Sequence, residues 1–181
     1  MDAVLPLRRG RPRRFDLSSA LRVASLVADG WTAREATSLP RSWNTVLAWS
    51  REHPEVAALF ALARLARAAR EAWAIEAHRR DSGQAIDPAE SLLISRWAEI
   101  GEAIDEFLRE ATREESADAI EQLRSLVGRG LAPLIEGWAY SLRHGQRGAL
   151  APSAEQLAEL RAALGSKGAS AVGTDSAGGG A

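Results

Sequence analysis

Five arginines lie within residues 8–14, which read RRGRPRR, and no other stretch of seven residues has so high a net charge. Arginine side chains bind phosphate oxygens through their planar N–H groups, so such a run is suited to the backbone of a nucleic acid. A segment this charged cannot bury itself in a core, and we expect it to form a mobile arm. Its candidate DNA-binding residues are Arg8, Arg9, Arg11, Arg13 and Arg14.

A second polar set lies in residues 32–54, whose pattern predicts two short helices joined by a tight turn. Thr32 and Glu35 have the spacing of a capping box that begins the first helix. Val46 and Trp49 are three residues apart, and we expect them to anchor the second helix. The polar residues of both helices and of the turn are the second candidate set for DNA: Arg34, Arg41, Ser42, Asn44, Thr45 and Arg51.

The elements that must position these residues are three helices, predicted over residues 17–29, 33–39 and 43–53. Gly30 is placed to end the first of them, and Trp31 is expected to pack beneath the group. The order matches the homeodomain-like helix-turn-helix, whose third helix enters the major groove of DNA. The alternative is an ordinary helical hairpin without a role in DNA binding.

Composition predicts an all-α, cytoplasmic protein. Of the 23 basic residues 22 are arginine, alanine is abundant, and both are strong helix formers. The absence of cysteine leaves no disulfide framework. There is no signal-peptide pattern, and the longest apolar run, residues 56–63, is too short to span a bilayer. The charge is +4 over residues 1–53 and −7 over residues 87–128, which implies different partners for the two parts.

The sequence carries no pattern typical of catalysis or of a bound cofactor. No glycine-rich loop ends in Lys-Ser or Lys-Thr, so the chain lacks a P-loop for ATP. His53, His78 and His144 do not have the spacing of metal ligands. The acidic residues of 87–121 fall between apolar positions, as expected for a solvent-exposed face. We therefore expect no enzyme, no cofactor and no metal site.

A long helix is predicted over residues 55–80, because Pro54 disfavours helix in the residue before it and is suited to begin the next helix. Its apolar side chains recur at three and four residues, in a coiled-coil-like seam that consists of Leu59, Leu62, Ala66, Ala69 and Trp73. A basic row beside this seam consists of Arg64, Arg67 and Arg70. For this row we favour ion pairs with Glu71 and Glu76 on the same helix over contacts with DNA.

Two further apolar stripes in residues 88–142 predict a helical hairpin with a kink or break at Gly128 and Gly130. In a monomer the two stripes would face only each other, and their large side chains suggest additional burial between subunits. We predict an oligomer interface formed by Leu93, Trp97, Ile100, Ile104, Phe107, Leu123, Leu134 and Trp138. A closed monomeric bundle is the competing interpretation.

The chain thus divides into five predicted parts. They are a disordered basic arm (1–14), a helix-turn-helix domain (15–53), a helical oligomerisation region (54–145), a linker with a short amphipathic helix (146–164) and a disordered tail (165–181). The short helix begins at Pro152 and Ser153. Its leucines must dock on another element, because a helix of this length is marginal alone.

Several of these features recur together in one family. Gly10-Arg11-Pro12 precedes Phe15, three short helices follow, and His53-Pro54-Glu55 leads into a long helix rich in alanine and arginine, with Val56, Phe60, Ala63 and Arg64. Over about residues 9–80 this order resembles the N-terminal half of phage terminase small subunits. Residues 9–12 also resemble the RGRP core of AT-hooks, which lay arginines along the minor groove of DNA; a solvated basic tail is the alternative for them.

The resemblance implies a viral or virus-derived protein that binds double-stranded DNA for genome packaging. It also implies assembly into a homo-oligomeric ring and regulation of a large terminase subunit that carries the ATPase and nuclease. No membrane partner is expected. One alternative is a dimeric transcription regulator with the same helix-turn-helix, and another is a helical scaffold that its basic arm tethers loosely to nucleic acid.

Overall fold

The computed structural model describes residues 15–37, 43–114, 117–145 and 152–165, and in these ranges the chain forms helices and no strand. The all-α prediction is therefore confirmed for this part of the chain. In order, the helices are α1 (Leu17–Ala28), α2 (Ala33–Thr37), α3 (Trp43–Glu52), α4 (Pro54–Asp81), α5 (Pro88–Glu114), α6 (Ala117–Gly128), α7 (Leu131–Arg143) and α8 (Ala154–Ala163). None of the helices found there is long and apolar enough to cross a membrane.

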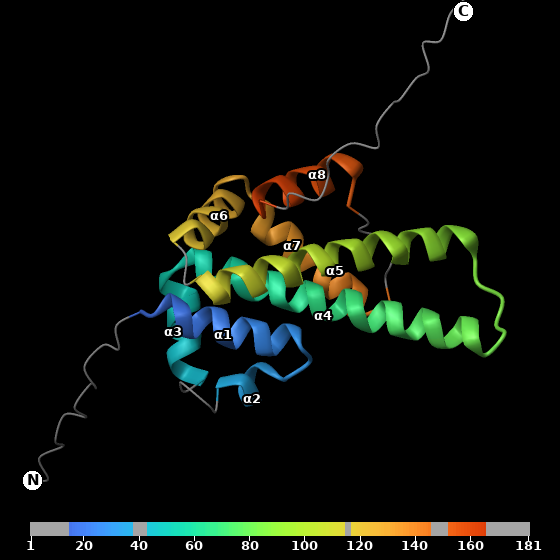
Figure 1. Cartoon of the computed structure of the whole chain (residues 1–181), viewed down its shortest axis with the longest axis horizontal. Coiled ribbons are helices and arrows are strands. Elements are labelled where there is room, and N and C mark those ends of the chain that lie inside the picture. The colour runs from blue at the N-terminus through green and yellow to red at the C-terminus, as the bar shows by residue number, and fades with distance from the viewer. Residues whose placement is uncertain (1–14, 38–42, 115–116, 146–151, 166–181) are drawn as a thin grey trace, which may run out of the picture.

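Helix α4 is the centre of the fold, and α1, α3, α5, α6 and α7 all pack against it (Figure 1). It begins at Pro54 with His53 as its N-cap, as predicted. Its apolar residues point in every direction, and Leu59, Leu62 and Leu65 are completely buried. A helix that is apolar all round must be covered on all sides, so over residues 56–69 α4 is a buried core helix rather than one half of a two-helix seam.

Small residues let α5 approach α4 closely along the pair of long helices that Figure 1 shows side by side. A Cβ atom built on Gly101 of α5 would lie 3.2 Å from the Cβ atom of Ala69 on α4. Such a separation is tighter than ordinary van der Waals contact, so only glycine fits at this position without a shift of its neighbour. The alanine-rich composition of α4 is thus a packing feature, in addition to its effect on helix propensity.

The three N-terminal helices begin and end within two residues of the predicted limits wherever the chain is described. The backbone N–H of Gly30 donates to the carbonyl of Val27, and the positive φ of Gly30, 103°, ends α1 as expected. Helix α1 also packs on α4 and α5, so its buried face belongs to the core of the whole chain. Trp31 does not pack beneath these helices; its side chain is 45% exposed.

The region predicted as a hairpin consists of three helices, with a break at Gly130 between α6 and α7. Gly130 has a φ of 69°, which an L side chain rarely adopts, and this explains why the break falls there. Asp87 begins α5 as predicted, because its carboxylate accepts a hydrogen bond of 2.9 Å from the backbone N–H of Ala89.

The predicted oligomer interface is corrected by the burial of its side chains within the single chain. Trp97, Ile100, Ile104, Phe107, Leu123 and Trp138 are between 0 and 4% exposed, and Leu93 is partly buried against the same core. Leu134 alone of the set is exposed, at 39%. The two apolar stripes are buried faces, as their periodicity predicts. Their partners are α4 and the neighbouring helices of the same chain, which favours the closed monomeric bundle.

Helix α8 begins directly after Ser153, close to the predicted start, and carries a complete capping box. The backbone N–H of Gln156 donates to Ser153 Oγ at 3.1 Å, and the backbone N–H of Ser153 donates to Gln156 Oε1 at 2.9 Å. The helix packs on α5 and α6, and its docked face consists of Leu157, Leu160, Ala163 and Leu164. Its expected docking partner is therefore the helical body itself.

Candidate nucleic-acid interface

Helix α2 is held at its start by the predicted capping box. The backbone N–H of Glu35 donates to Thr32 Oγ1 at 3.2 Å, and the backbone N–H of Thr32 donates to Glu35 Oε2 at 2.9 Å. The hydroxyl of Thr32 donates to the same carboxylate oxygen at 2.6 Å. These bonds, the one from the hydroxyl foremost, lower the pKa of Glu35 below its usual value of 4.5. The carboxylate is thus ionised, and the cap intact, at neutral pH.

Helix α3 is anchored by the two residues that the spacing identified. Val46 and Trp49 are each 2% exposed, and Ala36 of α2 is fully buried beside the same core. The aromatic contacts of α3 come from Phe15, which meets the ring of Trp49 edge-on at 5.6 Å between centroids. The same Phe15 ring stacks on His53 at 4.3 Å.

This aromatic contact joins two parts of the candidate interface. Phe15 directly follows the basic arm in sequence, whereas Trp49 and His53 bracket Arg51 at the carboxyl end of α3. Phe15, the residue that follows the arm, is therefore fixed beside the last turn of α3. That turn carries the exposed Arg51. Sequence reasoning missed this contact, although an aromatic residue between a basic run and the first helix was visible.

The predicted DNA-binding residues differ in what the structure describes of them. The arginines of the arm, Arg41 and Ser42 lie outside the described residues, as does the side chain of Asn44, whose backbone is in α3. Arg34 on α2 and Arg51 on α3 are exposed, in agreement with the prediction. Thr45 is half-buried and thus less outward than expected.

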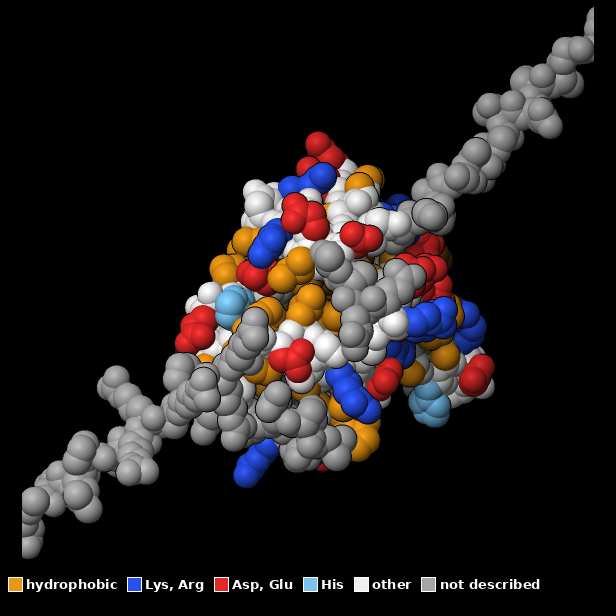
Figure 2. Space-filling view, turned by 60° about the vertical axis from the view of Figure 1, so that its left-hand side comes forward, with side chains coloured by type: hydrophobic (Ala, Val, Ile, Leu, Met, Phe, Trp, Pro, Cys, Tyr) orange, Lys and Arg blue, Asp and Glu red, His pale blue; other side chains and the backbone are white. Residues whose placement is uncertain are grey.

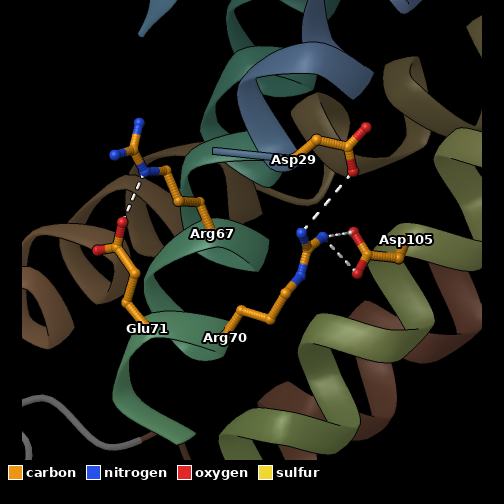
Figure 3. A network of polar contacts seen from close by, with 5 residues as sticks. All are labelled: Asp29, Arg67, Arg70, Glu71 and Asp105. Carbon is orange, nitrogen blue, oxygen red and sulfur yellow. Dashed lines mark hydrogen bonds and ion pairs between the residues drawn. The ribbon is translucent and has the colours of Figure 1, made fainter. Parts of the chain in front are cut away.

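The basic row of α4 is occupied by ion pairs, and Figure 3 shows those of Arg67 and Arg70. Arg67 Nε lies 2.7 Å from Glu71 Oε1, the intrahelical pair that the sequence favoured. Arg70 Nη2 lies 2.6 Å from Asp105 Oδ2 on α5, and its Nη1 lies 3.7 Å from Asp29 Oδ1 after α1. Arg64 pairs with Glu136 of α7, and the expected partner Glu76 pairs with Arg80 instead. The row therefore joins α4 to its neighbours.

Other arginines form no ion pair with any residue that the structure describes, and they are Arg22, Arg51, Arg96, Arg109, Arg113, Arg129 and Arg143. On the face that Figure 2 presents, acidic and basic side chains are interspersed with hydrophobic ones. A mixed surface of this kind gives no single-signed field, so attraction of a polyanion must depend on local groups of arginines.

Comparisons with known proteins add no assignment: no protein-family model, curated protein or solved structure matches this chain. In the described ranges, no group of three or more histidine, aspartate or glutamate side chains is arranged to hold a metal ion. Conclusions about function therefore depend on the chain's own residues and their arrangement.

Proposed function

We propose that the chain is a double-stranded DNA-binding protein that uses the basic arm and α3. The observation that supports this most is the stacking of Phe15 on His53 and against Trp49, at 4.3 and 5.6 Å. That contact places Phe15, the residue that directly follows the arm, beside the last turn of α3. An arm that neutralises phosphates next to a helix that reads base edges is a combination that supplies both affinity and sequence preference.

Within this class, we propose a role like that of a terminase small subunit. The chain would recognise viral or virus-derived DNA for packaging and regulate a large subunit that carries the ATPase and nuclease. The support is the resemblance over about residues 9–80, together with a short α2, an anchored α3 and a long α4 at the expected positions. Assembly into a ring belongs to the same proposal, but it requires residues other than the buried stripe of α5.

A dimeric helix-turn-helix transcription regulator is the second candidate. The observation that favours it is the closed core of the single chain, which leaves most of the predicted subunit interface unavailable. Mass by light scattering separates the two candidates, because packaging predicts a large ring and regulation predicts a dimer. In both cases we propose that the chain binds DNA without being an enzyme.

The substitution Asn44→Ala, at the second position of α3, tests whether the protein recognises a particular DNA sequence. Asparagine can bond the edge of adenine through two hydrogen bonds. We expect a loss of about 1–3 kcal/mol on a site obtained by selection from random DNA, and little loss on random DNA itself. The measurement is fluorescence anisotropy with labelled duplexes.

Arg51→Ala is the matched control on the same helix, since an arginine that holds phosphate should weaken binding to both kinds of DNA equally. An equal loss for Asn44→Ala would reassign Asn44 to a positioning role. If the wild-type protein binds neither kind of duplex at about 50 mM salt, where electrostatic binding is strong, the proposed function is wrong.

A further inference from the structure

A groove of about 560 Å³ lies between α1 and α5. The polar contact between the two helices here joins Ser25 Oγ and Thr112 Oγ1, which are 3.2 Å apart. Thr112 donates its proton to the carbonyl of Leu108 at 2.6 Å, and Ser25 lies 3.1 Å from the carbonyl of Leu21. The hydroxyls are thus satisfied within the protein, and they fix α1 against α5 rather than offering donors to a ligand.

Two arginines of α5 line this groove, and a third lies on α1 one turn before Ser25. Arg22 is exposed and lies three positions before Ser25, so the two residues share one face of α1. Arg109 has the same relation to Thr112 on α5, and both Arg109 and Arg113 line the groove. Neither of these two, nor Arg22, forms an ion pair with a residue that the structure describes.

Unlike Arg70, these three arginines lack an acidic partner among the residues that the structure describes. Arg70 also lines the groove, but Asp105 and Asp29 already neutralise its charge. Arg113 lies in the last turn of α5, where a cation complements the helix dipole. That explanation does not extend to Arg22 on another helix. Helix α5 therefore brings two unneutralised guanidinium groups to the groove, although it is otherwise an acidic helix. Arg22 adds a third such group on α1, one turn before the groove residue Ser25.

We propose that Arg22, Arg109 and Arg113 form a binding site for the phosphate backbone of duplex DNA. The inference rests on the proposed function and deepens it. Helix α1 packs beside α5 (Figure 1), and the basic arm directly precedes α1 in sequence. A duplex bound by the arm would therefore reach Arg22 and the carboxyl end of α5. Guanidinium groups suit this role, since they present several N–H donors to phosphate oxygens in a fixed plane.

The test replaces all three arginines by alanine in the full-length protein and measures binding to a random-sequence duplex at several salt concentrations. Each lost phosphate contact should flatten the plot of log affinity against log salt by about 0.9, so we expect a slope shallower by about 2–3. All three positions are outside the apolar core, and circular dichroism should show unchanged helicity. Replacement of the same three residues by lysine should retain most of the slope, because it retains the charge.

The matched control is a triple alanine variant of Arg96, Arg124 and Arg129, which are exposed arginines elsewhere on the surface. It removes the same charge and should leave the slope nearly unchanged. If both triple variants have the same slope, the site is refuted, whereas deletion of the arm still flattens the slope if the proposed function is right. If neither the triple variant nor the arm deletion alters binding, or the wild type does not bind the duplex, both proposals are overturned.

Discussion

Ile104→Glu is expected to unfold the chain or to leave it barely folded. Ile104 is completely buried on α5, within the single core that all the longer helices share. The substitution removes a packed side chain and places a carboxyl group where no partner for it exists in the core. Together these effects should cost about 5 kcal/mol or more, a large part of the stability of an ordinary domain. Urea denaturation followed by circular dichroism measures the loss.

Glu106→Gln is the control for this variant, because Glu106 is exposed two positions further along the same helix. It should change the free energy of unfolding by no more than about 0.5 kcal/mol. The contrary result would be an Ile104→Glu protein that keeps its helicity and its denaturation midpoint but has a lower mass by light scattering. That outcome would show that the apolar face of α5 forms a subunit interface.

Deletion of residues 1–14 is expected to have the largest effect on DNA binding. If each of the five arginines in residues 8–14 neutralises one phosphate, the plot of log affinity against log salt is steeper in the wild type by about 4.5. Between about 50 and 200 mM salt the wild type should then lose about 500-fold more affinity than the deletion variant. Fluorescence anisotropy on a random-sequence duplex gives both slopes.

A variant with all five arginines of the arm replaced by lysine separates charge from chain length. It keeps the charge and should keep most of the slope, with weaker binding where a paired contact of arginine is lost. Helical content should be the same in all three proteins, since the arm precedes α1. An unchanged slope after deletion would show that the arm does not contact DNA.

Local signals made the positions of the helices predictable. The capping boxes at Thr32 and Ser153, proline at the start of α4, and glycine at the end of α1 all depend on residues within one helical turn. Such features do not require knowledge of the tertiary fold. They are also the features for which sequence and structure agree most closely.

The partners of each buried face were not predictable in the same way. A 4-3-4 spacing on α5 shows that one face is covered, but a neighbouring helix and a second subunit satisfy it equally well. The better signal was on α4, where apolar residues such as Leu59, Leu62 and Leu65 occupy several faces. That distribution requires several covering helices, and with them the chain can close its own core.

In the candidate site, too, the features set by local sequence were predictable and those set by tertiary packing were not. The exposed Arg51 and the anchors Val46 and Trp49 follow from helical periodicity. The stacking of Phe15 on His53 depends on the angle at which α1 meets α3, which no local pattern determines. Likewise, the intrahelical pair of Arg67 with Glu71 was predictable, whereas the pairing of Arg70 with Asp105 required the packing of α4 on α5.

The most direct test of DNA binding by this surface is a titration of the isotope-labelled full-length protein with a short duplex, followed by the amide shifts in NMR spectra. We predict that the shifts concentrate in the arm, in α3, at the start of α1 around Arg22 and in the last two turns of α5. The outer ends of this helix pair, which are the carboxyl end of α4 and the amino end of α5, should be unaffected. Shifts confined to those outer ends, or no shifts at all at about 50 mM salt, where electrostatic binding is strong, would contradict the account.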